Sequence, residues 1–181
     1  MSDSYAVPSY IGHGTNAYTT SQLARYATAI ATSGNVYDLT LLDRQTDSKG
    51  NTLKKYEPDI INTVDVSQNV WDDIHDGMYR VVQTHRQFDG LGVDVAGKTG
   101  TAEVNVYHPN HGMFVGYAPA SDPEYAIAVR IENGYTSGNA CLAADDIFKY
   151  IFELTDEKSI LTGVAASDTL SLIHISEPTR P

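Results

Sequence analysis

The first half of GVDVAGKTGTAEVNVY, residues 92–107, fits two incompatible structures, and each of them implies a different fold for the chain. Gly92 followed by Gly-Lys-Thr at 97–99 matches G-x-x-x-x-G-K-[ST], the phosphate-binding loop of nucleotide hydrolases. Such a loop turns through small, flexible residues and opens into a helix whose N–H groups bind the anion. Residues 93–96 are Val-Asp-Val-Ala, which are stiff and include a carboxylate that would repel phosphate. The sequence therefore leaves a nucleotide hydrolase as the weakest alternative.

The residues around and after the Lys-Thr pair favour a strand. Residues 100–107 contain alternating β-branched side chains, which start a helix poorly and form strands well. A strand at the edge of a cleft can offer backbone N–H groups to a carbonyl that becomes an oxyanion. Lys98 would place positive charge beside the reacting centre, and Thr99 and Thr101 would share one face because strand side chains alternate. Gly100 between them would leave room for a substrate backbone.

The rest of the chain shows helical and strand patterns in an order typical of an α+β domain. Apolar spacing predicts helices at 19–33, 67–85 and 139–154, and strands at 36–42, 52–56, 100–107, 112–118 and 125–132. We expect Asp72 and Asp73 in the first turn of the second helix. The first two strands are expected to pair through a turn at 47–51, and the last two through residues 119–123. The sequence therefore predicts an antiparallel sheet flanked by helices.

Composition and charge limit the partners and the compartment. The 181 residues suit one domain, and 12 Lys and Arg against 23 Asp and Glu give a net charge of −11. Because this charge repels phosphate backbones, we expect no nucleic-acid partner. No run approaches the roughly 18 apolar residues of a membrane span, and the first residues lack the basic and apolar regions of a signal peptide. The chain is therefore expected to be cytosolic or to lack its true start.

Few other residues point to a metal or a reactive group, and we expect neither a metal nor a cofactor. His108 and His111 lie in a Pro-containing loop without a third ligand at a recognisable spacing. His13 stands between two glycines and is interpreted as a turn residue. The turn at 47–51 lacks the spaced carboxylates of a calcium loop. The single cysteine, Cys141, has apolar neighbours that favour burial over reactivity, and it allows no intrachain disulfide.

Four segments, in this order along the chain, resemble the transpeptidase domain of penicillin-binding proteins. They are IGHGTNAYTTSQLARYATAIATSGNVY at 11–37, DDIHDGMYRVV at 72–82, AGKTGTAE at 96–103 and HGMFVGYAPASDPEYAIAVRIENG at 111–134. The likeness runs from about Ser9 to Leu154 and is strongest toward the monofunctional class B enzymes. The resemblance implies a β-lactamase/transpeptidase-like fold and a peptidoglycan D,D-transpeptidase, which cross-links cell-wall peptides by serine acyl transfer. It also implies stem peptides ending in D-Ala-D-Ala and β-lactam antibiotics as ligands.

By the same resemblance, the Lys-Thr-Gly-Thr stretch forms part of the active site. Lys98 would shape the electrostatics around the catalytic serine and the substrate carboxylate. Thr99 and Thr101 would hold that carboxylate, and the backbone N–H of Thr101 would be one of two oxyanion donors. The implied catalytic residues are thus Lys98 and Thr101, and the implied substrate-binding residues are Lys98, Thr99, Gly100 and Thr101.

Two motifs that the family needs are not recognisable in this sequence. No lysine has a serine three residues before it, so S-x-x-K, the source of the nucleophile, does not occur. S-x-N strings occur at 33–35, 67–69 and 137–139, and we interpret them as caps and turns. We therefore expect residues 1–154 to be the C-terminal part of a transpeptidase domain, inactive without the missing N-terminal part of the same polypeptide. Residues 155–181, which lose periodicity, are expected to be disordered or non-native.

The resemblance also implies a location and leaves alternatives open. Enzymes of this family act on the extracytoplasmic face of the bacterial cytoplasmic membrane, and the implied anchor is an N-terminal segment absent from this chain. A β-lactam sensor domain or a serine β-lactamase could carry the same Lys-Thr-Gly strand on the same fold. The residues upstream of the chain would discriminate between these functions.

Overall fold

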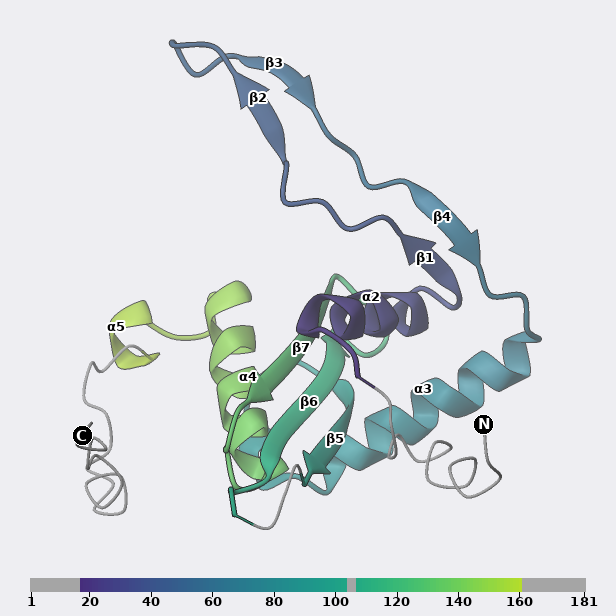
Figure 1. The fold of residues 1–181 in the computed structure, drawn as a ribbon, viewed down its shortest axis with the longest axis vertical. Coiled ribbons are helices and arrows are strands. Elements are labelled where there is room, and N and C mark those ends of the chain that lie inside the picture. The colour runs from purple at the N-terminus through teal and green to yellow at the C-terminus, as the bar shows by residue number, and fades with distance from the viewer. Residues whose placement is uncertain (1–16, 104–106, 161–181) are drawn as a thin grey trace, which may run out of the picture.

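The computed structural model describes residues 17–103 and 107–160 and contains a three-stranded antiparallel sheet with packed helices (Figure 1). The sheet has the order β5-β6-β7, and its strands are Ala96–Ala102, His111–Ala118 and Tyr125–Ile131. The β5–β6 pairing runs without a bulge, with Lys98 opposite Val115. This antiparallel sheet and its flanking helices confirm the predicted α+β class.

Each face of the sheet has its own hydrophobic cluster. The helices are α2 (Thr20–Ala31), α3 (Gln68–Gln83), α4 (Ser137–Ile151) and the short α5 (Glu157–Ile160), with a 3₁₀ turn η2 at Arg86–Phe88. Tyr117 of β6 packs with Ile30 of α2 and Trp71 of α3. Phe114, three residues away and on the other face of β6, packs with Phe148 of α4. Because Phe114 and Tyr117 point to opposite faces and both are fully buried, the core lies on both sides of the middle strand.

Helix α2 begins and ends close to the predicted residues. Thr19 forms a capping box with Gln22: Thr19 Oγ1 accepts from Gln22 N at 3.2 Å, and Gln22 Oε1 accepts from Thr19 N at 2.8 Å. The helix ends at Ala31, and the chain then turns at Gly34 with a φ of +110°. A Cβ at Gly34 would lie 2.5 Å from the Val64 carbonyl oxygen, so both the backbone angle and the space require glycine.

The prediction that Asp72 and Asp73 lie in the first turn of the second helix is wrong. Helix α3 begins at Gln68 after Ser67 as its N-cap residue, and its first turn contains no acidic side chain. The two aspartates therefore lie one turn further along, where the charge of the helix end is weaker. Asp72 instead accepts a hydrogen bond from Gln68 Nε2 at 2.9 Å.

Helix α4 begins at Ser137, earlier than the predicted start at Asn139. Thr136 precedes it in extended backbone, with φ −140° and ψ 158°. Thr136 Oγ1 accepts from Gly138 N at 2.9 Å, which caps the helix. The string Ser-Gly-Asn at 137–139 is therefore the capped first turn of α4.

A two-stranded arm projects from the body (Figure 1). Strand β1 (Asn35–Tyr37) pairs with β4 (Ile60–Thr63), and β2 (Arg44–Thr46) pairs with β3 (Thr52–Lys55). The predicted pairing of 36–42 with 52–56 is therefore wrong, and β4 has no counterpart in the prediction.

The predicted turn at 47–51 is confirmed, and it explains why the predicted pairing fails. Asp47 Oδ1 accepts from Lys49 N at 2.8 Å and from Asn51 N at 2.9 Å, which closes the loop directly after Thr46. A loop this short places Thr46 opposite Thr52. Further along the arm from this pair, β1 therefore lies opposite β4 and not opposite β3.

The strand predicted at 100–107 begins earlier, at Ala96, so the Lys-Thr-Gly triplet lies inside β5. Residues 104–106 lie outside the described residues. Strands β6 and β7 confirm the predictions at 112–118 and 125–132 to within one residue. In the described part of the chain, no helix combines the length and the apolar character of a membrane span. Residues 157–160 form α5, and the tail prediction for 161–181 concerns residues outside the described ranges.

Candidate active site

Strand β5 presents the Lys-Thr-Gly-Thr stretch at an edge of the sheet. Within the described residues, β5 pairs only with β6, so its other edge has no strand partner. Such an edge presents alternate backbone N–H and C=O groups outward, which can bind an extended peptide or a carbonyl oxygen. The register places Lys98 opposite Val115 and Thr101 opposite Gly112.

Lys98 lies on the face that α2 and α3 cover. Together with Val115, Ile30 and Trp71 it lines a mainly apolar cavity of about 460 Å³. The Lys98 side chain is exposed, and its Nζ donates to the Thr99 carbonyl oxygen at 2.8 Å. Lys98 forms no ion pair with another described residue. Its charge can therefore act on a ligand at the strand edge.

Thr99 and Thr101 lie on the opposite face, toward α4, as the alternation of strand side chains predicts. Thr99 is opposite Phe114, whose ring belongs to the cluster that contains α4. Thr101 Oγ1 accepts a hydrogen bond from the backbone N of Ser137, the first residue of α4, at 3.2 Å. The sequence-predicted residues are thus on one strand but on two faces: the cation on one and the two hydroxyl groups on the other.

The two glycines of β5 have different structural roles. A Cβ at Gly97 would lie 2.4 Å from Phe114 Cζ, so the packing of the phenylalanine ring requires glycine there. A Cβ at Gly100 would meet only Met113 Cβ, at an ordinary contact distance of 3.5 Å. The fold itself therefore does not require glycine at position 100, which is consistent with the predicted need for space above it.

The phosphate-loop alternative is wrong. Lys98 and Thr99 lie in the middle of an extended strand, and no helix follows them in the described residues before α4. Upstream, Gly92 has a φ of +89° and belongs to the loop between η2 and β5. The match to the nucleotide pattern is accidental because Lys98 and Thr99 lie inside a strand and do not open a helix.

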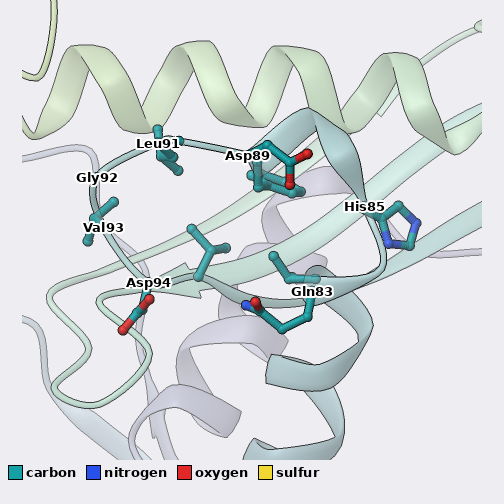
Figure 2. Close-up of a pocket in the computed structure, with 11 residues that line it drawn as sticks. Gln83, His85, Asp89, Leu91, Gly92, Val93 and Asp94 are labelled. Atoms are coloured by element: carbon teal, nitrogen blue, oxygen red, sulfur yellow. The ribbon is translucent and has the colours of Figure 1, made fainter.

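A separate polar cavity of about 430 Å³ lies at this loop, before the start of β5 (Figure 2). Its labelled lining includes Gln83, His85, Asp89 and Asp94, on separate parts of the loop and the end of α3. His85 Nδ1 lies 2.8 Å from the Val81 carbonyl oxygen and is thereby engaged by the helix end. None of the four predicted site residues lines this cavity, so it is distinct from the candidate active site.

Two further candidate residues, His111 and Cys141, lie within described elements. His111 is the first residue of β6, not a loop residue, and its Nδ1 accepts from Asn133 N at 3.0 Å. Cys141 is fully buried as predicted, and this burial raises the pKa of its thiol to about 11, which disfavours the reactive thiolate. No cluster of three or more metal-ligating side chains occurs within the described residues. His13 lies outside them.

Sequence reasoning missed two residues that shape the site, Gly112 and Ser137. Gly112 lies opposite Thr101, and a Cβ there would be 2.3 Å from the Thr136 carbonyl oxygen. Ser137 contributes its backbone N–H and not its hydroxyl, so no side-chain motif signals it. The available signal was the glycine in HGMF at 111–114, in a strand where glycine is otherwise unfavourable.

A family model described as the penicillin-binding protein transpeptidase domain matches residues 4–153 of this chain. The peptidoglycan D,D-transpeptidase MrdA of Acinetobacter baumannii is 33% identical over an alignment of 159 residues, and the match covers 77% of this chain and 23% of that protein. The chain thus spans about a quarter of the length of this curated relative.

Two solved structures show the same arrangement of elements. The D,D-transpeptidase domain of a peptidoglycan glycosyltransferase from Eggerthella lenta superimposes with a TM-score of 0.66 at 33% identity, over 75% of this chain and 32% of that one. Penicillin-binding protein A of Mycobacterium tuberculosis, solved as a ceftriaxone acyl-enzyme complex, gives a TM-score of 0.68 at 26% identity, over 81% and 34%. The described fold is therefore that of about a third of such a chain.

Proposed function

The chain belongs to the penicillin-binding protein transpeptidase family, and from this premise we propose that it forms one wall of a peptidoglycan D,D-transpeptidase site. The relatives named above are transpeptidases and penicillin-binding proteins, which favours this function over a β-lactam sensor or a serine β-lactamase. The observation that carries the proposal is the unpaired edge of β5, which combines the Lys98 ammonium group, the Thr101 hydroxyl and open space above Gly100.

The proposed reaction transfers an acyl group to a serine and then to an amine. The serine Oγ attacks the carbonyl carbon between the last two D-Ala residues of a stem peptide, and the terminal D-Ala leaves with a proton as the C–N bond breaks. An amine of a second stem peptide then attacks the ester, loses a proton and releases the serine. Because S-x-x-K does not occur in these 181 residues, the serine would come from a segment outside them. The chain alone is therefore expected to be inactive.

In this reaction the residues of β5 would bind and stabilise. Both steps pass through a tetrahedral oxyanion, and the backbone N–H of Thr101 would be one of its two donors. The hydroxyl groups of Thr99 and Thr101 would bind the terminal carboxylate of the substrate. Lys98 would add positive charge, which acts strongly here because no carboxylate of the described residues pairs with it. Gly100 would let the stem-peptide backbone approach.

The same groups would bind β-lactam antibiotics, which present a reactive amide carbonyl beside a carboxylate. No cofactor is required for this chemistry. The substrate lies outside the cytoplasm, so we infer that the protein acts on the extracytoplasmic face of the bacterial cytoplasmic membrane. Any anchor would belong to a part of the polypeptide beyond this sequence.

The proposal is tested by carboxylate recognition. The ¹⁵N-labelled chain is titrated with Nα,Nε-diacetyl-Lys-D-Ala-D-Ala and with the same peptide carrying a C-terminal amide. The acid should shift the backbone amide resonances of Lys98 and Thr101 in a saturable way, and the amide should not. Lys98→Ala should weaken binding of the acid by roughly tenfold or more, because a hydrogen bond to a charged group contributes about 1.5–3 kcal/mol. Equal shifts with both peptides would contradict the proposal.

A second measurement tests the role of a serine from outside these residues. The chain alone should form no covalent adduct with a fluorescent penicillin, because it carries no S-x-x-K serine. Stoichiometric labelling of the purified chain would show that a serine within it is the nucleophile, and the proposed division of the site would be wrong.

A further inference from the structure

We propose that the backbone N–H of Ser137, at the start of α4, orients the Thr101 hydroxyl so that it donates to the carboxylate of the substrate. Ser137 is in this sense a positioning residue that acts through Thr101. The inference rests on the proposed function, because it concerns the same carboxylate. It begins from the 3.2 Å hydrogen bond in which Ser137 N donates to Thr101 Oγ1.

The direction of this hydrogen bond fixes what the hydroxyl can do next. A threonine hydroxyl has one O–H donor and two acceptor lone pairs, and a backbone N–H can only donate. Thr101 Oγ1 must therefore accept from Ser137, which turns its own hydrogen away from the helix. Thr101 is exposed, so that hydrogen points to a place a ligand can reach. An ionised carboxylate only accepts hydrogen bonds, and so it matches a hydroxyl held as a donor.

The position of Ser137 adds an electrostatic contribution of the same sign. It is the first residue of a 15-residue helix, whose N-terminal end carries a partial positive charge. A carboxylate bound to Thr101 would lie one hydroxyl group away from that end. Lys98 and the end of α4 would thus act on it from the two faces of β5.

Gly112 explains why the start of α4 can lie so close to β5. It faces Thr101 across the sheet, and the Thr136 carbonyl oxygen lies only 2.3 Å from where its Cβ would be. Any larger residue would push the segment before α4 off the sheet and would move Ser137 away from Thr101. A hydrogen bond from α4 also holds this segment: Asn139 Nδ2 donates to the Gly134 carbonyl oxygen at 2.9 Å.

A second contact fixes the segment at its other end. The imidazole of His111, next to Gly112 in β6, accepts from Asn133 N at 3.0 Å. The turn between Asn133 and Tyr135, both with positive φ, is thereby tied to the strand that pairs with β5. Contacts elsewhere in the fold therefore set the distance between Ser137 N and Thr101 Oγ1.

The variant Ser137→Pro removes the donor and little else. Proline is tolerated at the first position of a helix, where its missing N–H has no partner within the helix. The residue before a proline must be extended, and Thr136 already is, with φ −140° and ψ 158°. The Thr136 cap to Gly138 N does not involve Ser137. The matched control Ser137→Ala keeps the N–H and removes only the side-chain hydroxyl.

The experiment measures two dissociation constants from the chemical shifts of the protein's backbone N–H groups. One ligand is diacetyl-Lys-D-Ala-D-Ala with its free carboxylate, and the other is the same peptide with a C-terminal amide. Ser137→Pro should weaken binding of the acid about five- to tenfold, as expected for the loss of one hydrogen bond between neutral groups, because the Thr101 hydroxyl remains but is no longer oriented. Binding of the peptide with the C-terminal amide should not change. Ser137→Ala should bind like the original chain. In a Thr101→Val background the proline should have no further effect, because the group through which it acts is gone.

The outcomes separate this inference from the proposed function. If the original chain does not prefer the acid, the proposed function fails. If the original chain prefers the acid but Ser137→Pro binds the acid equally well, only the role of Ser137 fails. The same holds if Ser137→Pro weakens binding of the acid as much in the Thr101→Val background as in the original chain. Should Ser137→Pro unfold, the Ser137 amide resonance decides: it must shift when the acid is added to the original chain and stay unchanged in Thr101→Val. A resonance that does not respond in the original chain overturns the inference.

Discussion

The projecting arm and the central sheet are both antiparallel, but different interactions hold them. Every residue of β2, β3 and β4 is exposed, and Leu41 between the arm strands is 105% exposed. In the sheet, Phe114 is 0% and Tyr117 1% exposed. A two-stranded ribbon is only marginally stable by itself, whereas buried apolar side chains on both faces stabilise a sheet strongly. Turn chemistry therefore sets the register of the arm, whereas core packing sets the register of the sheet.

Charge placement in the arm leads to the same conclusion. Arg44 of β2 lies directly opposite Lys55 of β3, and like charges in such a pair are unfavourable. Each has an acidic neighbour: Arg44 Nε lies 2.6 Å from Asp43 Oδ2, and Lys55 Nζ lies 2.7 Å from Glu57 Oε1. These ion pairs are exposed and contribute little to stability, so they offset the repulsion without defining the pairing.

The largest expected effect comes from emptying the core beside β6. Phe114→Ala should lower the free energy of unfolding by about 3–5 kcal/mol, because it leaves a cavity against α4 that the surroundings fill only in part. Leu41→Ala in the arm is the control and should change that free energy by no more than about 0.5 kcal/mol. Urea unfolding followed by far-UV circular dichroism measures both. Comparable losses would mean that the arm has packing interactions that its exposure does not reveal.

A smaller effect distinguishes two glycines of the same strand. Gly97→Ala should destabilise the chain by about 1–3 kcal/mol, because its Cβ would overlap the Phe114 ring. Gly100→Ala should change stability by only about 0.5 kcal/mol, since its Cβ meets Met113 at an ordinary distance. The same urea titration compares them. If Gly100→Ala proves as harmful, glycine at this position is a requirement of the fold and its predicted role in substrate approach loses its basis.

The contrast between the arm and the central sheet also explains how far the sequence could predict the fold. Helix α2 was predictable because its capping box and its glycine stop are local signals, and so were the two long strands of the hairpin β6–β7. The pairing in the arm was not, because the segment 36–42 has the strand pattern but its partner is chosen by the length of a loop further along. A single extra residue in the assumed loop changes every pair outward from it.

The sequence could point to the candidate site only where its side chains form a recognisable motif. Lys98, Thr99 and Thr101 form a recognisable motif, and alternation alone places the two threonines on one face. Ser137 was not predictable, because it acts through its backbone and lies 36 residues from Thr101. Gly112 permits that contact, but in the sequence it indicates only a residue that is unfavourable in a strand.

The smallest expected effect is a titration confined to the arm. The pKa of Asp47 is held below its ordinary 3.8, chiefly because its carboxylate accepts a hydrogen bond from the Asn51 side chain and also from the backbone N–H groups of Asn51 and Lys49. A pKa lowered by folding means that the ionised carboxylate stabilises the turn above pH 3.8 and that this contribution is lost as the pH falls through the lowered value. The ¹³C shift of the Asp47 carboxyl should therefore titrate below pH 3.8, and the amide resonances of Lys49 and Asn51 should follow the same curve.

The sheet provides the reference for this titration, since the Phe114 amide should not follow the Asp47 curve. Asn51→Ala removes the largest cause of the lowered pKa and should return it toward 3.8 without changing the free energy of unfolding of the sheet. An Asp47 carboxyl that already titrates at 3.8 in the original chain would mean that these hydrogen bonds are not made in solution. The loop would then no longer fix Thr46 opposite Thr52, and the contrast between a turn-determined arm and a packing-determined sheet would fail at its weaker side.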